Sequence, residues 1–394
     1  MAETLGVIVF QEQVGKVARD LADFTAGRAE LLRRALAHKR AGEQVAAFRA
    51  EFVAGAAAQG VARAVAERVF GQLQAFGGYA FPKSHAAAFA VLTYQSAWLR
   101  RYQPAAFFAA TLRHQPMGFY PAHVVVSEAR CCGVEIHPVD VETSSLLATV
   151  EGQALRPGSG QALRPDSGQA LRLGLAVVAG LGEAGGQSVV EARRFGPFRS
   201  LADFCRRTQL GRQAVEALIW AGAFDGWGVP RRQLLWDLQA ALEAAHEPPA
   251  LGLPSPEEER PRFGFLSARG RLWTEVAHTG IAAGAHLTAL VGDKLRAMGI
   301  TPSGALPDLR DGARVWVGGV IASAQRPPTV GGTAFLALED EGALINAVLR
   351  PRVYEASRQA LKSPFVVVEG QVQRRGQAIS VLARKVMPLQ METG

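Results

Sequence analysis

Cysteine is scarce in this chain, since only Cys131, Cys132 and Cys205 occur among its 394 residues. Adjacent cysteines rarely bridge each other, and no Cys-x-x-Cys pair suggests a zinc site. The chain also lacks an uncharged apolar run of about 18 residues, and its N-terminus lacks a basic segment before an apolar run. These absences predict a reduced, cytoplasmic protein that neither crosses a membrane nor carries an export signal.

Closely spaced pairs of aspartates of the Asp-x-Asp kind are missing as well. Metal-dependent phosphoryl transfer needs several carboxylates to hold two divalent ions, and no Asp-x-Asp sequence occurs. The nearest approaches are Asp140 with Glu142 and the run Glu339-Asp340-Glu341, and neither suits such a site. The eight histidines form no His-Glu-x-x-His or His-x-His pattern, which argues against a metallohydrolase. We therefore expect this chain to bind no metal or cofactor itself.

Positive charge is in excess. Lys and Arg number 43 against 35 Asp and Glu, which gives a net charge of +8. This excess favours a polyanionic partner such as nucleic acid, although an arginine-rich proteome would produce the same balance. The length predicts two or three domains, and hydrophobic residues make up 48% of the chain, which is enough to fill their cores.

Residues 1–145 have the periodicity of helices. In the segment 41–60, Val45, Phe48 and Phe52 fall on one helical face, and Gly60 supplies a stop. The same reasoning predicts a helix over 27–38, with Thr25 as its cap.

The stretch FPKSHAAAFAVLTYQ, residues 81–95, opens another predicted helix, which runs over 85–102 with Ser84 as N-cap. Its interior is apolar nearly all round, so we expect it to lie buried between neighbours, with Pro104 opening the next helix. A helix N-terminus attracts anions, and Lys83 and His85 would strengthen it for a phosphate chain. The more common explanation is that Ser84 only caps the helix while Lys83 is solvated.

A second basic cluster lies at the end of the helix predicted over 27–38. Cations at that end complement the helix dipole, so a purely structural role is again the more common explanation. Phosphate binding is the alternative. The cluster comprises Arg33, Arg34, His38, Lys39 and Arg40.

Residues 146–172 contain a unit of eight residues, GQALRPGS, repeated nearly three times. A period this short, rich in Gly and Pro, indicates an expanded surface loop, and we assign it no function. A second linker, rich in Pro and Glu, begins the connecting segment 246–311.

Residues 173–245 lie between these segments and carry the pattern of a helix-hairpin-helix. Gly180-Leu181-Gly182 separates two predicted helices, and such glycines let backbone N–H groups approach a DNA phosphate. A degenerate second copy surrounds Leu210 and Gly211, which predicts a tandem module. Ordinary helical turns are the alternative.

The region 312–388 changes to short runs of Val, Ile, Leu and Phe separated by glycine-containing turns. Five strands with a helix between the third and the fourth are typical of an OB-fold, a small Greek-key barrel. Exposed aromatic and basic residues on such a barrel can hold single-stranded nucleic acid. Trp316 and Phe335 could equally be core residues. The candidates are Arg314, Trp316, Arg326, Phe335, Arg350 and Arg352.

Two long segments together resemble a known family. GVIVFQEQVGKVARDLADFTAGRAELLRRALAHKR, and the stretch from FGGYAFPKSHAAAFA through QPMGFY to HPVDV, are similar to the bacterial C-family DNA polymerases, that is, the DNA polymerase III alpha subunit. The combination of FPKSHAAAFA with QPMGFY most resembles the error-prone, translesion branch. The similarity covers essentially the whole chain apart from the octapeptide repeat.

The resemblance implies an α+β multidomain protein. Residues 1–145 would be the mostly helical fingers, 173–245 a tandem helix-hairpin-helix module on duplex DNA, and 312–388 a five-stranded OB-fold β-barrel on single-stranded template. In that family the fingers contact the incoming deoxynucleotide triphosphate, which favours phosphate contacts for the basic residues of the fingers. The replicative branch commonly has Asn where this chain has Pro82. The implied nucleotide contacts are Lys83, Ser84, His85, Arg33, Arg34 and Lys39.

The family's palm, which carries the catalytic aspartates, would lie upstream of Met1. We therefore expect this chain to be a nucleotidyltransferase by family that is inactive in replication or translesion repair without a palm-containing partner chain. Mg²⁺ would then be bound only in the complete polymerase, and a sliding clamp is a further candidate partner. The alternatives are a stand-alone DNA-binding module and an inactive remnant of a split polymerase gene.

Overall fold

The computed structural model describes residues 1–37, 42–76, 81–118, 120–152, 169–246, 261–327 and 331–389. They belong to two compact units, Met1–Trp98 and Leu99–Gly394. The domain boundaries expected at 145, 172, 245 and 311 stay predictions. Across the described ranges, no helix has both the length and the apolar character needed to cross a bilayer.

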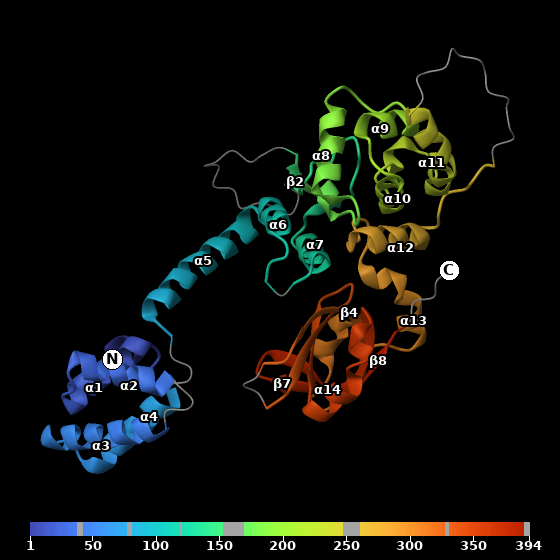
Figure 1. Cartoon of the computed structure of the whole chain (residues 1–394). Coiled ribbons are helices and arrows are strands. Elements are labelled where there is room, and N and C mark those ends of the chain that lie inside the picture. The colour runs from blue at the N-terminus through green and yellow to red at the C-terminus, as the bar shows by residue number, and fades with distance from the viewer. Residues whose placement is uncertain are drawn as a thin grey trace. The chain divides into compact units, whose positions relative to one another are not determined.

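The first unit is a helical bundle from which α5 projects (Figure 1). Its core contains the fully buried side chains of Leu32, Phe52, Phe70 and Leu73. These apolar residues recur at helical spacing, so burying them in one core stabilises all four bundle helices together. The elements are η1 (Ala2–Thr4), α1 (Gln11–Ala22), α2 (Ala26–Ala37), α3 (Gly42–Ala58), α4 (Arg63–Phe76) and α5 (Lys83–Tyr102).

The helix boundaries expected for α2 and α3 are confirmed to within one or two residues. The Arg28 N–H donates to Thr25 Oγ1 at 3.2 Å, so Thr25 caps α2 as expected. Val45, Phe48 and Phe52 are buried on α3, and Gly60 follows its end with a φ of +79°. A left-handed residue at this place terminates a helix, and glycine adopts it without strain.

The prediction that α5 is a buried helix capped by Ser84 is wrong. The helix begins one residue earlier, at Lys83, and none of its residues is buried. Its large apolar side chains, among them Phe89, Leu92 and Tyr94, are exposed. Apolar character on every side of a helix shows that contact with protein is favourable, but it does not say which chain supplies that contact.

The second unit contains a helical region with a small sheet. The strands β1 (Glu135–His137), β3 (Ala170–Arg172) and β2 (Thr149–Glu151) lie side by side in that order, with β1 parallel to β3 and β2 antiparallel to it. The α-helices of this region are α6 (Pro104–Arg113), α7 (Ala122–Cys131), α8 (Gly182–Arg193), α9 (Leu201–Thr208), α10 (Arg212–Ala221) and α11 (Arg231–His246). The 3₁₀ turns are η2 (Leu175–Val177) and η3 (Asp225–Trp227).

A closed barrel forms the rest of this unit, with strand order β4-β5-β6-β8-β7, as expected for an OB-fold. Strand β4 is long because it pairs with β7 through its first half and with β5 through its second half. Helix α14 follows β6, in the expected place. The elements are β4 (Arg314–Gln325), β5 (Ala334–Glu339), β6 (Leu344–Leu349), α14 (Pro351–Ser357), η6 (Ala360–Lys362), β7 (Phe365–Arg375) and β8 (Ala378–Pro388).

A layer of short helices joins the helical region to the barrel. Leu272, Leu287 and Leu290 of this layer share an apolar cluster with Val320 and Phe365 of the barrel. The barrel is therefore packed against this layer through buried side chains. The layer consists of α12 (Ala268–Thr279), η4 (Leu287–Leu290), α13 (Gly292–Ala297) and η5 (Ser303–Asp308).

Candidate nucleic-acid interface

The first hairpin turn has the geometry expected of a phosphate contact. Gly180 and Gly182 have φ angles of +83° and +69°, a backbone conformation that glycine alone adopts freely. Both glycines are exposed while Leu181 between them is buried. A Cβ at either glycine would meet no atom within 4 Å, so the outer side of the turn is open to a ligand. The turn leads into α8, whose first N–H groups carry the positive end of the helix dipole.

The second hairpin is formed by α9 and α10, as expected, but its turn differs. The left-handed residue is Gln209, with a φ of +54°, while Gly211 has an ordinary φ of −69°. The two turns meet at α8, where a Cβ on Gly185 would lie 2.9 Å from Leu181 and 3.2 Å from Leu210. The buried Leu181 and the partly buried Leu210 therefore pack on the same small residue, which holds the hairpins together as one module.

Most arginines beside the second hairpin have internal partners. Arg207 donates to the Ala192 carbonyl at 2.5 Å and pairs with Asp203 at 3.1 Å, and Arg212 pairs with Glu216 at 2.7 Å. The pKa of Asp203 is lowered by a hydrogen bond from the Arg199 N–H and by its arginine partners, against the opposing effect of burial. Arg207 and Arg212 are therefore engaged in the module's own structure.

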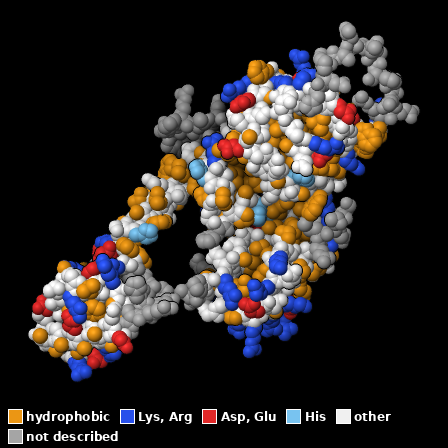
Figure 2. All heavy atoms as spheres, in the orientation of Figure 1, with side chains coloured by type: hydrophobic (Ala, Val, Ile, Leu, Met, Phe, Trp, Pro, Cys, Tyr) orange, Lys and Arg blue, Asp and Glu red, His pale blue; other side chains and the backbone are white. Residues whose placement is uncertain are grey.

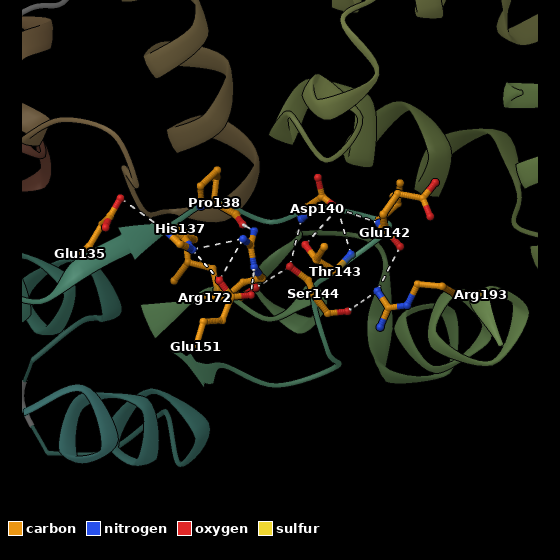
Figure 3. Close-up of polar contacts among 12 residues, drawn as sticks. Glu135, His137, Pro138, Asp140, Glu142, Thr143, Ser144, Glu151, Arg172 and Arg193 are labelled. Carbon is orange, nitrogen blue, oxygen red and sulfur yellow. Dashed lines mark hydrogen bonds and ion pairs between the residues drawn. The ribbon is translucent and has the colours of Figure 1, made fainter. Parts of the chain in front are cut away.

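The carboxylate of Asp140 is engaged in local structure (Figure 3). Asp140 accepts hydrogen bonds from the N–H groups of Glu142 and Thr143 at 2.7 and 2.9 Å. Arg193 of α8 donates to the carbonyls of Val141 and Ser144 at 3.2 and 3.0 Å. Asp140 therefore shapes a turn that α8 holds in place.

On the barrel, the aromatic candidates are surface residues. Trp316 and Phe335 have 38% and 41% of their surface exposed. Trp316 pairs with Glu369 near the start of β4, whereas Phe335 pairs with Gln325 at the end of that strand. The two rings thus lie at opposite ends of β4 and do not form one stacking surface. Phe335 lies on the face of the second and third barrel strands, where OB-folds bind oligonucleotides.

The basic candidates of the barrel also lie in different places. Figure 2 shows Lys and Arg side chains gathered over α14. Arg350 and Arg352, at the start of this helix, are exposed, and Arg314 is exposed on β4. Arg326 pairs with Glu355 at 3.2 Å, and its guanidinium lies 4.7 Å from the centre of the Tyr354 ring.

In the first unit, the start of α5 is already occupied by an anion. The Lys83 N–H donates to both carboxylate oxygens of Glu12 at 3.1 and 3.0 Å, and Lys83 Nζ pairs with Glu3 at 2.5 Å. The pKa of Glu3 is lowered by its hydrogen bond to Lys83. Phe10 and Phe81 bring the starts of α1 and α5 together, with ring centres 5.8 Å apart. The attraction of this helix end for anions is satisfied by carboxylates of the same chain.

The other predicted nucleotide contacts do not gather at the start of α5. Arg33 and Arg34 both pair with Glu30, at 2.7 and 2.9 Å, and these bonds lower the pKa of Glu30 to about 2. Ser84 lies inside α5, and the His85 ring lies 4.4 Å from that of Phe89. Lys39 lies outside the described residues.

Two basic residues that the sequence analysis missed lie near Arg33. A hollow of about 350 Å³ between α1 and α2 is lined by Lys16, Arg19 and Arg33, together with Glu12, Glu30 and Pro82. Lys16 and Arg19 lie three residues apart on α1, a spacing that places both on one helical face. That spacing was the available signal, and the hollow brings Arg33 close to the start of α5.

The described residues contain no cluster of three or more His, Cys, Asp or Glu side chains that could hold a metal ion. In the run Glu339-Asp340-Glu341 at the barrel turn, the Asp340 carboxylate already accepts hydrogen bonds from within the protein. Its donors are Ser303 Oγ at 2.5 Å and the Gly342 and Ala343 N–H groups at 2.8 and 3.0 Å. These carboxylates do not fit a centre for two divalent ions.

Comparison with known proteins identifies two parts of the chain. Residues 1–60 match the bacterial DNA polymerase III alpha subunit finger domain, and residues 133–234 match a helix-hairpin-helix motif. A protein of Anaeromyxobacter sp. (strain K) named error-prone DNA polymerase is 41% identical over 99% of this chain. The chain is homologous to error-prone DNA polymerases. The resemblance seen in the sequence is thereby confirmed.

Other error-prone DNA polymerases show a comparable similarity to this chain. Error-prone DNA polymerases of Corynebacterium efficiens and Burkholderia pseudomallei are each 38% identical, over 99% and 94% of this chain. The chain spans 34% of the length of each of these relatives. Among solved structures, asparaginyl-tRNA synthetase from Pyrococcus horikoshii matches 24% of the chain with a TM-score of 0.21, which supports no argument.

Proposed function

We propose that this polymerase homologue holds DNA and the incoming nucleotide during error-prone synthesis in replication and translesion repair. Catalytic carboxylates would come from a palm-containing chain. The observation that carries the proposal is the similarity to error-prone polymerases along 99% of the chain. The open glycine turn of the first hairpin and the basic surface over α14 support the DNA contact.

Duplex DNA would bind at the helix-hairpin-helix module. The Gly180 turn is exposed and lies at the positive end of α8, so a phosphate oxygen can approach its backbone N–H groups. Single-stranded template would bind at the barrel, where Phe335 offers a ring for stacking and Arg350 and Arg352 offer charge.

The nucleotide would bind at the hollow between α1 and α2. Its triphosphate would meet Lys16, Arg19 and Arg33, which line the hollow. Arg33 already pairs with Glu30, and Lys83 at the start of α5 pairs with Glu3. Binding therefore involves an exchange, in which phosphate oxygens replace carboxylates around the start of α5. Mg²⁺ would enter with the complete polymerase, whose expected location is the cytoplasm, and a sliding clamp remains a candidate partner.

A stand-alone DNA-binding module is the second candidate function. The carboxylates at the start of α5 favour it, because they leave the helix end without a vacant anion site. In that case the first unit would be a scaffold, and added nucleotide would leave DNA binding unchanged.

Primer extension with a palm-containing chain tests the proposal. The purified homologue is expected to bind primer-template DNA with a steep loss of affinity between 50 and 200 mM salt. It should extend the primer only when a chain carrying the remaining part of an error-prone polymerase is added. Extension with Mg²⁺ by the homologue alone would contradict the proposed division of labour. DNA binding without any extension by the mixture would favour the stand-alone module.

A further inference from the structure

A group of exposed aromatic and basic side chains lies along α11 and the segment just before α12. Trp236 of α11 has 59% of its surface exposed, and Phe265, just before α12, has 62% exposed. Arg232 and Arg262 are exposed beside them in the sequence. We call Arg232, Trp236, Arg262, Phe263 and Phe265 the aromatic-arginine surface. Figure 2 shows hydrophobic side chains with neighbouring Lys and Arg side chains at the edge of the molecule beside α11.

Specific contacts hold this surface together. The rings of Trp236 and Phe263 lie 5.8 Å apart at an angle of 46°. The Phe263 N–H donates to Gln233 Oε1 at 3.3 Å, and Arg232 donates to the Gly264 carbonyl at 3.4 Å. Two polar side chains of α11 therefore bind the backbone on both sides of Phe263, and they fix the aromatic segment along the helix.

The surface leaves large apolar groups in water. Burying a tryptophan or phenylalanine contributes roughly 1.5–3 kcal/mol or more, so their exposure is unfavourable unless a ligand covers them. Although the neighbouring Leu234 and Leu238 are buried in the core, Trp236 of the same helix is not. Because the contacts from Gln233 and Arg232 hold the segment in this position, the exposed rings are a fixed feature of the fold.

The described segment that carries Phe263 and Phe265 is basic, whereas Glu257, Glu258 and Glu259 precede it in the sequence. Residues 261–274 contain Arg262, Arg269 and Arg271 but no Asp or Glu. The closest acidic residue on α11, Asp237, accepts from Gln233 Nε2 at 3.2 Å. Glu275, the next acid along the chain, accepts from the Ala283 N–H at 2.8 Å. Both carboxylates therefore have partners within the protein.

We propose that the aromatic-arginine surface binds single-stranded DNA, with bases stacked on Trp236 and Phe265 and phosphates held by Arg232 and Arg262. Rings beside arginines suit this ligand, because every base has a π-face and every linkage carries a negative charge. Duplex DNA hides its base faces, so it would gain only the charge contact. This site extends the proposed DNA-holding function and is separate from the hairpin turns and the barrel.

Binding of oligo(dT) of about 16 nucleotides by the full chain tests the inference. Replacing Trp236 and Phe265 together by alanine is expected to weaken oligo(dT) binding by at least about thirtyfold, since two stacked bases are lost and each contributes roughly 1–3 kcal/mol. Duplex binding should change less than twofold. The matched control is Tyr120→Ala, which removes an aromatic side chain that is 52% exposed outside the surface, the hairpin module and the barrel, and it should leave both affinities unchanged.

A charge variant keeps the test valid if the double variant unfolds. Arg262→Glu changes an exposed residue, and it should weaken oligo(dT) binding and reduce the slope of log affinity against log salt by about one to two. Ultraviolet cross-linking of oligo(dT) should label peptides that contain Trp236 or Phe265. Unchanged oligo(dT) affinity in both variants, with duplex binding intact, would overturn the inference and leave a protein partner as the explanation. Loss of all DNA binding in the parent chain would instead contradict the proposed function.

Discussion

Individual charges in the first unit are paired in ways that affect how a nucleotide could bind. Lys83 is expected to meet phosphate, yet its backbone N–H binds Glu12 and its ammonium binds Glu3. An exposed ion pair contributes less than about 1 kcal/mol, so a triphosphate with several negative oxygens can displace it. We therefore expect the carboxylates to reduce the affinity for anions without abolishing it.

Neutralising Glu12 should strengthen triphosphate binding. In Glu12→Gln the helix N-terminus keeps a hydrogen-bond acceptor but loses the negative charge, so we expect a gain of roughly threefold to tenfold in affinity. A fluorescent deoxynucleotide triphosphate titrated into the full chain would measure it. The control is Glu51→Gln, which breaks the pair with Arg28 on another part of the bundle and should leave the affinity unchanged. An equal effect of both variants would place the nucleotide elsewhere.

At the scale of elements, the two hairpins differ in how their turns reach the left-handed conformation. The first uses Gly180 and Gly182, and the second uses Gln209. A side chain at a left-handed position costs roughly 1 kcal/mol and projects from the turn, so the first turn is the better site for a close phosphate approach. The shared packing of Leu181 and Leu210 fixes the two turns relative to each other.

Alanine at Gly180 should therefore weaken duplex binding. We expect a loss of about tenfold, accompanied by a stability loss of about 1 kcal/mol from the left-handed backbone. Gly211→Ala is the matched control, because its φ of −69° suits alanine and its Cβ would meet no atom within 4 Å. Fluorescence anisotropy with duplex DNA and thermal unfolding would separate the two effects. Equal duplex affinity in both variants would argue against a phosphate contact at the first turn.

At the scale of the whole molecule, α5 stands out because its large apolar side chains are exposed. It has no buried residue, although Phe89, Val91, Leu92 and Tyr94 are each more than half exposed. So much apolar surface on one helix favours a protein partner. The palm-containing chain of the proposed polymerase is the candidate.

Mixing with a palm-containing chain should therefore protect α5. Amide hydrogen exchange in the peptide covering residues 86–98 is expected to slow by tenfold or more, while α9 and α10 should exchange as before. Replacing Phe89 and Leu92 by serine should reduce both this protection and primer extension by the mixture. Protection that is already complete without the added chain would show that this protein covers α5 by itself.

Local signals in the sequence were sufficient to predict the strands of the barrel and the first hairpin turn. Short runs of Val, Ile, Leu and Phe over 312–388 predicted the five strands of the barrel, and Gly180 and Gly182 predicted a turn between two helices, because both properties depend on neighbouring residues. The resemblance to C-family polymerases added the domain roles, which periodicity alone does not contain.

Tertiary structure alone decided the environment of the site residues. Trp316 and Phe335 were equally compatible with core and surface until the barrel closed and left both exposed at opposite ends of β4. Lys83 forms an ion pair with Glu3, which lies 80 residues away in the sequence. Helix α5 is exposed, although its composition is typical of a buried helix. Burial and charge pairing depend on which distant segments meet, and that information lies in the packing of the chain as a whole.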